Sequence, residues 1–134
     1  MSSFLIKVPP QRFDVGERPI FIERTFFDGE TVSPGAEAFV WFTETKGGAG
    51  LAYVGTIYSA SSMNEIHAKR WRVAVTIRSV ATGLTDADLE PYFEARTNSP
   101  ISTLGFKLFR HPHDKICALT LAEADFLRTF ETLA

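Results

Sequence analysis

Basic side chains follow one face of a single predicted strand. Between residues 70 and 80 apolar and polar residues alternate, and the cations in or beside this stretch are Lys69, Arg70, Arg72 and Arg78. Because alternate residues of a β-strand share a face, the spacing gathers the arginines into one stripe. Such a stripe can contact successive phosphates, which positions a polyanion without reading its sequence. The alternative is an ordinary solvated strand face, since mixed-sign surfaces are the norm.

A second candidate group combines aromatic rings with hydroxyl groups. Trp41 and Thr43 occupy one face of a predicted strand, where the ring can stack on a planar ligand and the hydroxyl can hydrogen-bond to its edge. Tyr53 and Tyr58 lie on the following strand and can supply a further hydroxyl, and Phe13 can close the rim of such a pocket. The alternative for each ring is simple packing in the core.

The remaining motifs with chemical potential are expected to be structural. The segment 111–114, His-Pro-His-Asp, has only His67 as a further histidine, so neither a metal site nor a cofactor is predicted. Cys117 lies among apolar residues and is expected to be a buried thiol. The glycine-rich stretch 46–50 lacks the Gly-Lys-Ser/Thr ending of a phosphate-binding loop and is expected to be a hairpin turn. No Gly-x-Ser-x-Gly elbow is present, and no catalytic residue is assigned.

These side chains depend on a small number of predicted strands and helices. Apolar runs and period-two alternation predict strands over residues 3–8, 38–43, 51–60, 70–80 and 113–119. Residues 11–36 are punctuated by Gly and Pro, and only 20–27 is expected to hold a short apolar element. Capping spacing predicts helix starts at Ser62, Thr85 and Thr120. Pro91 is expected to end or kink the second of these helices, or to open another short helix through residues 92–93.

The order of these elements predicts the fold class. Tight turns and the lack of a strand–helix–strand rhythm argue against a parallel sheet. We therefore expect residues 1–134 to form one α+β domain, a small curled antiparallel β-barrel with a few short helices. Gly55, inside the strand over 51–60, predicts a bulge or a sharp bend of the kind that barrel corners need.

Composition and charge exclude several classes of protein. Hydrophobic residues make up 45% of the chain and charged residues 22%, which is typical of neither disordered nor membrane-spanning proteins. No apolar run approaches the roughly 20 residues of a spanning helix, and the first ten residues do not resemble a secretion signal. The single cysteine fits a reducing compartment, so a cytoplasmic location is expected.

The charge is unevenly distributed along the chain. The whole chain carries −2, which gives no general attraction to nucleic acid or to anionic lipid. Residues 66–115, however, hold eight basic and five acidic residues, a net charge of +3. This segment contains the arginine stripe and a second basic cluster, formed by Lys107, Arg110, His111, His113 and Lys115. Contact with a polyanion is expected in this part of the chain.

Three stretches resemble the EVE branch of the PUA-like superfamily. Residues 6–14 resemble the family's opening strand, with matches at Lys7, Pro10 and Phe13 but without the family's Ser-Glu pair at positions 8–9. Residues 34–43 resemble a Gly-Asp turn and the apolar strand after it, with Ala in place of Asp and Trp41 as the aromatic. Residues 50–57 resemble the next strand, which also runs into a Gly. The family's Trp-x-Gly signature before the turn is absent.

The resemblance implies a small closed barrel with a pocket that accepts an extruded base. It implies a non-catalytic module that binds DNA or RNA carrying a modified nucleobase, since a flipped base needs stacking partners and nearby cations. The residues expected to contact the base are Trp41, Thr43, Tyr53, Phe13 and Lys7. The residues expected to contact phosphates are Lys69, Arg70, Arg72 and Arg78.

Two alternatives stay open beside the base-binding interpretation. Relatives in the ASCH branch include small hydrolases that act on modified nucleosides or RNA through Lys, Thr and Glu side chains. Residues 43–46, Thr-Glu-Thr-Lys, offer these types at a strand end, with Lys7 as a second candidate base. Because adjacent strand residues point to opposite faces, at most two of the first three can share a site. The other alternative is a protein-interaction domain without a nucleic-acid role.

Overall fold

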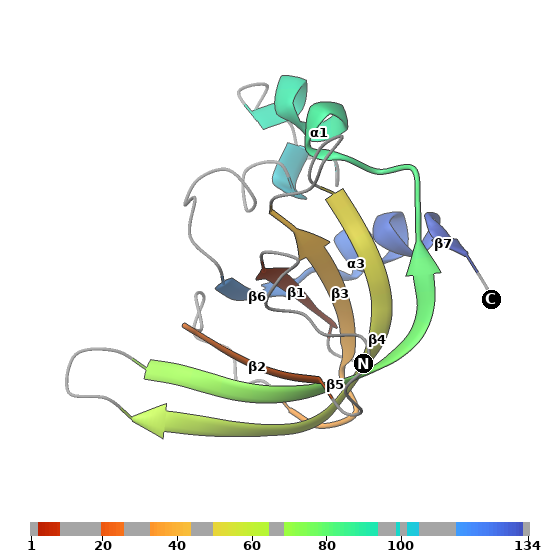
Figure 1. Cartoon of the computed structure of the whole chain (residues 1–134). Helices are drawn as coiled ribbons and strands as arrows, with labels where there is room; N and C mark the ends of the chain where they lie inside the picture. Colours follow the sequence, from red (N-terminus) through yellow and green to blue (C-terminus); the bar gives the residue numbers. More distant parts are fainter. Residues whose placement is uncertain are drawn as a thin grey trace.

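The computed structural model describes residues 3–8, 20–25, 33–43, 50–64, 69–93, 99, 102–104 and 115–132, with side chains except at 20–25, 61–64, 69–72, 90–93 and 115. Their strands are β1 (Ser3–Val8), β2 (Ile20–Thr25), β3 (Glu37–Phe42), β4 (Gly50–Asn64), β5 (Lys69–Ala81), β6 (Lys115–Leu119) and β7 (Glu131–Thr132). They form one sheet in the order β2-β5-β4-β3-β1-β6, with β7 beside β5. The sheet is strongly curled (Figure 1), and its edge strands β2 and β6 lie close together.

The sheet is mixed, which corrects the expectation of a purely antiparallel one. β1 runs parallel to β3 and antiparallel to β6, while the other described pairs are antiparallel. A parallel pair needs a long crossover rather than a tight turn, and the segment between β1 and β3, which includes β2, supplies that length. The α+β class and the curled sheet agree with the expectation from the sequence.

β4 and β5 form a long hairpin whose far end runs to the lower left in Figure 1, away from the helices. The predicted strands over 51–60 and 70–80 are confirmed, and both are longer than expected. The predicted helix start at Ser62 is wrong, because residues 61–64 continue β4 and pair with β5. Ladder hydrogen bonds from a neighbouring strand override a local capping signal here.

Bulges curl the two long strands. Shifts of register leave Ala52 and Tyr58 on β4, and Arg78 on β5, as the extra residue opposite a neighbour. Such a residue bends its strand and increases the local twist. Gly55 lies beside one shift, and a Cβ added to it would be 2.2 Å from the carbonyl oxygen of Thr76. The bend predicted at Gly55 is therefore present, and the close backbone approach explains why a glycine stands there.

Two hydrophobic clusters lie on opposite faces of the sheet. Along β1 and β3 successive residues alternate between them: Phe4, Ile6, Ala38 and Val40 belong to the inner cluster, and Leu5, Phe39 and Trp41 to the outer one. The inner cluster contains strand residues and Ala36, so the sheet curls far enough to pack against itself. The outer cluster is covered by helical residues such as Leu89, Leu104 and Leu127.

The helices that cover the outer cluster begin where the sequence predicts. α3 (Leu121–Arg128) has a complete capping box, in which Thr120 and Glu123 bond to each other's backbone N–H. Before α1 (Asp86–Phe93) the Thr85 N–H donates to the Asp88 carboxylate at 2.9 Å. α1 does not end at Pro91 but continues to Phe93. A single helical turn at residues 102–104 adds Leu104 to the same cover.

Candidate nucleic-acid interface

The basic residues at the start of β5 lie in the far half of the long hairpin. Arg70 stands opposite Met63 on β4 and Thr25 on β2, and Arg72 stands opposite Ser61 and Glu23. This part of β5 is therefore an interior strand with a fixed backbone register on both sides. By strand alternation positions 70 and 72 belong to the same face as Thr76, which is exposed. The backbone therefore places positions 70 and 72 on one face of β5, as the predicted stripe requires.

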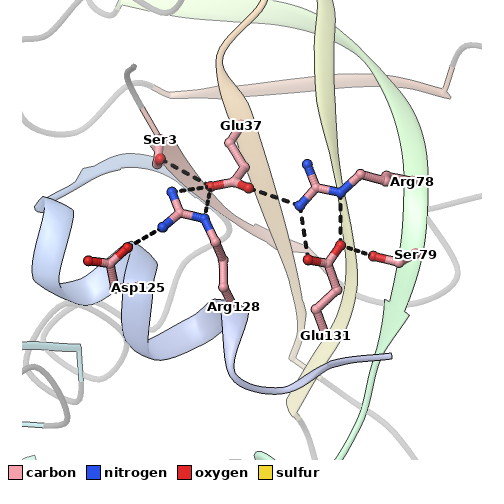
Figure 2. A network of polar contacts seen from close by, with 7 residues as sticks. All are labelled: Ser3, Glu37, Arg78, Ser79, Asp125, Arg128 and Glu131. Atoms are coloured by element: carbon pink, nitrogen blue, oxygen red, sulfur yellow. Dashed lines mark hydrogen bonds and ion pairs between the residues drawn. The ribbon is translucent and has the colours of Figure 1, made fainter. Parts of the chain in front are cut away.

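Arg78, the last residue of the predicted stripe, forms ion pairs with two carboxylates. Its Nη2 donates to Glu37 Oε2 at 2.9 Å, and its Nε donates to Glu131 Oε2 at 2.8 Å. The hydrogen bond to Glu131, followed by the one to Glu37, raises the pKa of the Arg78 guanidinium. Arg78 is the extra residue of the bulge in β5. Arg78 and its neighbour Ser79 both hydrogen-bond to Glu131 (Figure 2). The structure therefore removes Arg78 from the phosphate-contacting set, because β7 supplies its counter-charge.

Glu37 is the centre of this polar network, which we call the Glu37 network (Figure 2). Glu37 is 5% exposed, and its carboxylate accepts hydrogen bonds from Arg78 on one side and from Arg128 on the other, with Ser3 Oγ at 3.4 Å. Burial opposes ionisation of Glu37, but the hydrogen bonds and charges of the two arginines outweigh it and lower the pKa of the carboxyl. The pKa of Glu131 is also lowered, chiefly by its hydrogen bond from Arg78.

The Glu37 network is suited to holding the fold and not to binding a polyanion. It joins β1, β3, β5, α3 and β7 through residues that lie far apart in the sequence. Its charged members are two arginines and three carboxylates, namely Arg78, Arg128, Glu37, Glu131 and Asp125, a net charge of −1. A phosphate approaching it would meet more carboxylates than cations.

Trp41, the predicted stacking residue, is a core residue in the structure. Its exposed fraction is 0%, and its ring belongs to the outer cluster beneath the helices. The indole Nε1–H donates to Asp86 Oδ1 at 2.7 Å, which satisfies the one polar atom of the ring and ties β3 to α1. In this arrangement no face of the Trp41 ring is available to a base. Trp41 therefore has the alternative role considered from the sequence, which is packing in the core.

Tyr53 lies on the other side of the sheet from Trp41. It pairs with Val40 and packs against the inner cluster, where its ring meets Phe42 edge-on at a centroid distance of 5.8 Å. Both rings of this pair are only partly buried. The structure therefore does not bring Trp41 and Tyr53 into one pocket, and the accessible aromatic surface near the end of β3 belongs to Phe42 and Tyr53.

Of the other residues predicted to contact a base, Lys7 and Thr43 lie next to Trp41 on β1 and at the end of β3. Lys7 is nearly buried and stands in register opposite Trp41 on β3. Thr43 is partly buried, and its N–H donates to the Val8 carbonyl oxygen at 3.0 Å, which extends the pairing of β1 with β3. Phe13 lies outside the described residues, as does residue 46 of the hydrolase alternative. Lys7 and Thr43 thus lie beside Trp41 in the sheet, but the Trp41 ring is buried and offers no face to a base.

Tyr58 is the residue whose exposure the sequence does not indicate. It was expected as a strand residue that could supply a hydroxyl, and it is 68% exposed. Its exposure follows from the bulge, because an extra residue breaks strict alternation and redirects the side chain, and this bulge has no signal in the sequence. Cys117, by contrast, is buried in the outer cluster as predicted.

Neither a metal site among the described side chains nor a similarity to a known protein assigns an activity to this chain. The described side chains contain no group of three or more His, Cys, Asp or Glu that could hold a metal ion. In the same part of the chain, no helix combines the length and apolar character needed to cross a membrane. No family model matches the sequence, and neither a curated protein nor a solved structure is significantly similar to it.

Proposed function

We propose that this protein is a non-catalytic nucleic-acid-binding module of the PUA-like type, which holds phosphates with the basic start of β5 and reads a nucleobase with aromatic rings. The observation that carries the proposal is the position of residues 69–72, Lys-Arg-Trp-Arg, in the far half of the long hairpin. This half lies away from the Glu37 network, whose carboxylates neutralise the other arginine of the stripe.

Electrostatics favours this half of the hairpin as the phosphate-binding part. The segment 66–115 carries a net +3 although the chain as a whole carries −2, and the start of β5 is its densest run of cations. Lys and Arg in a fixed register release counterions from the phosphate backbone, which supplies most of the affinity in non-specific binding. The acidic remainder of the chain limits binding elsewhere on the surface.

The base-reading part of the proposal moves from Trp41 to the Phe42–Tyr53 pair. An extruded base needs an accessible ring face, and the Phe42–Tyr53 pair is only partly buried, whereas Trp41 is completely buried. The Tyr53 hydroxyl can then bond to the edge of the base. A base modified by an added methyl group is the expected ligand class, because the added apolar area is buried against the rings.

The test is binding of fluorescently labelled oligonucleotides, plain and base-methylated, at about 50 mM and about 200 mM salt. The variant Lys69→Ala/Arg70→Ala/Arg72→Ala is compared with Lys107→Ala/Arg110→Ala/Lys115→Ala, which removes the same formal charge from the second basic cluster. We expect the first variant to weaken binding of every strand and to reduce the slope of log K against log salt by up to about 2. We expect the second variant to bind nearly as the wild type does.

Three outcomes would contradict the proposal or a part of it. Absence of wild-type binding to any oligonucleotide at the lower salt concentration would remove the nucleic-acid function altogether. Equal losses in the two triple variants would show that net charge, rather than the start of β5, governs binding. A preference for methylated strands that is unaffected by Tyr53→Ala would leave phosphate binding intact and move base reading away from the Phe42–Tyr53 pair.

A further inference from the structure

Among the aromatic side chains that the structure describes, Tyr58 is the one that is exposed to solvent. It is 68% exposed, whereas Phe4, Phe39 and Trp41 are completely buried. A tyrosine left in solvent on a strand gains little from its apolar area, so its ring is free to bury against a ligand. The exposure is not explained by position in a loop, because Tyr58 lies within β4.

The bulge in β4 is what turns this ring outward. Ile57 pairs with Val75 and Ser59 pairs with Ala74, so Tyr58 is the extra residue between them. Tyr58 and Ser59 are both exposed, while Ile57 and Ala60 pack with the inner cluster. Two successive side chains therefore stand on the outer face, which strict alternation forbids and a bulge permits.

The same face of the sheet continues toward the basic start of β5. Beyond the bulge, the positions of β4 that share this face are Ser59, Ser61 and Met63, and they pair with Ala74, Arg72 and Arg70. At about 3.4 Å per residue, the position of Arg72 lies about 7 Å along the strand from the Ser59–Ala74 pair. The exposed ring of Tyr58 and the positions of Arg72 and Arg70 thus lie one after another along the same face of the hairpin.

We propose that Tyr58 stacks on an unpaired base of single-stranded nucleic acid whose neighbouring phosphates contact the basic start of β5. The inference rests on the proposed function and specifies its ligand. A ring on an open sheet surface can stack on a base that is already unpaired, but it cannot reach the face of a base inside a duplex. Because every base has a π-face, the contact tolerates any sequence.

The experiment compares Tyr58→Ala and Tyr58→Phe with the wild type in binding three probes of equal length: a mixed-sequence single strand, the corresponding duplex, and an abasic single strand. We expect Tyr58→Ala to weaken binding of the mixed single strand at least about fivefold, as loss of one stacked base implies. Binding of the abasic strand and the salt slope should stay unchanged, because Tyr58 contacts no phosphate. Tyr58→Phe should bind as the wild type does.

A matched control is Leu121→Ala, which removes another strongly exposed apolar side chain (73% exposed) from the N-terminal turn of α3. This variant should bind all probes normally. If Tyr58→Ala binds the mixed single strand as tightly as the wild type while the β5 triple variant does not, the stacking role is overturned and the proposed function stands. If the wild type binds none of the probes, both are overturned. An equal loss on the abasic strand would also overturn the stacking role.

Discussion

Glu37 accepts hydrogen bonds from two arginines that approach from different elements, Arg78 on β5 and Arg128 on α3. A carboxylate that is almost fully buried is stable as an anion only when its charge is compensated in this way. The two arginines keep contact with solvent and have further acidic partners, Glu131 and Asp125. Removal of the central charge therefore affects more contacts than removal of either peripheral acid.

We predict that Glu37→Gln lowers the free energy of unfolding by about 2 kcal/mol, since it replaces charge-assisted hydrogen bonds at a buried site with neutral ones. The measurement is urea denaturation at neutral pH. The matched control is Asp125→Asn, because Asp125 pairs with Arg128 but its side chain is 61% exposed. That exposed pair should contribute less than about 1 kcal/mol. Equal losses in the two variants would refute the central position of Glu37.

The predicted base-binding residues show what the alternation of apolar and polar residues along a strand can and cannot predict. Alternation correctly groups residues that share a face of one strand, but it does not give the register between strands. Opposite residues of an antiparallel pair share a face, and Tyr53 lies opposite Val40, not Trp41. Arg78 likewise follows the pattern, but its partner Glu131 is 53 residues away in the sequence and arrives with β7. Neither contact has a local signal.

The curl of the long hairpin depends on Gly55. We predict that Gly55→Ala lowers the free energy of unfolding by more than about 2 kcal/mol, because the added Cβ would lie 2.2 Å from a backbone oxygen of β5 that cannot rotate away. A suitable comparison is Gly35→Asn. Gly35 has φ +88 and open space around it, and Asn tolerates left-handed backbone, so this change should cost less than about 1 kcal/mol. Thermal or urea unfolding of both variants tests the difference.

The elements themselves were largely predictable, for reasons that are local. The alternating or apolar runs of β1, β3 and β5 and the capping box of α3 each specify one conformation within a few residues. The helix expected at Ser62 failed because its signal is equally local, whereas the strand that replaces it is held by pairing with β5. The parallel pairing of β1 with β3 had no signal, since it depends on the path of the intervening chain.

Acid stability of the molecule as a whole should depend on the Glu37 network. The pKa values of Glu37 and Glu131 are both lowered in the folded state. A carboxyl with a lowered folded pKa stabilises the fold at pH values above its unfolded pKa, and this contribution is lost as the pH falls through the folded pKa. The facing groups Arg78 and Arg128 remain charged throughout this range.

We therefore predict that the stability difference between the wild type and Glu37→Gln is constant from about pH 7 to about pH 5 and narrows toward about pH 3. The measurement is urea unfolding of both proteins at a series of pH values in one ionic strength. A difference that keeps its size down to the lowest pH would mean that ionisation of Glu37 does not contribute, and that the amide variant is destabilised by geometry alone.

The place of β1 in the sheet has a consequence for how the chain folds while it is being synthesised. β1 lies between β3 and β6, and its residue Ser3 pairs with Glu37 on one side and with Leu119 on the other. β1 is the first of these strands to be synthesised, so it cannot pair with both neighbours until β6 (Lys115–Leu119) has been synthesised as well. Pairings so distant in sequence close slowly, and the apolar residues of β1 stay accessible to chaperones for that time.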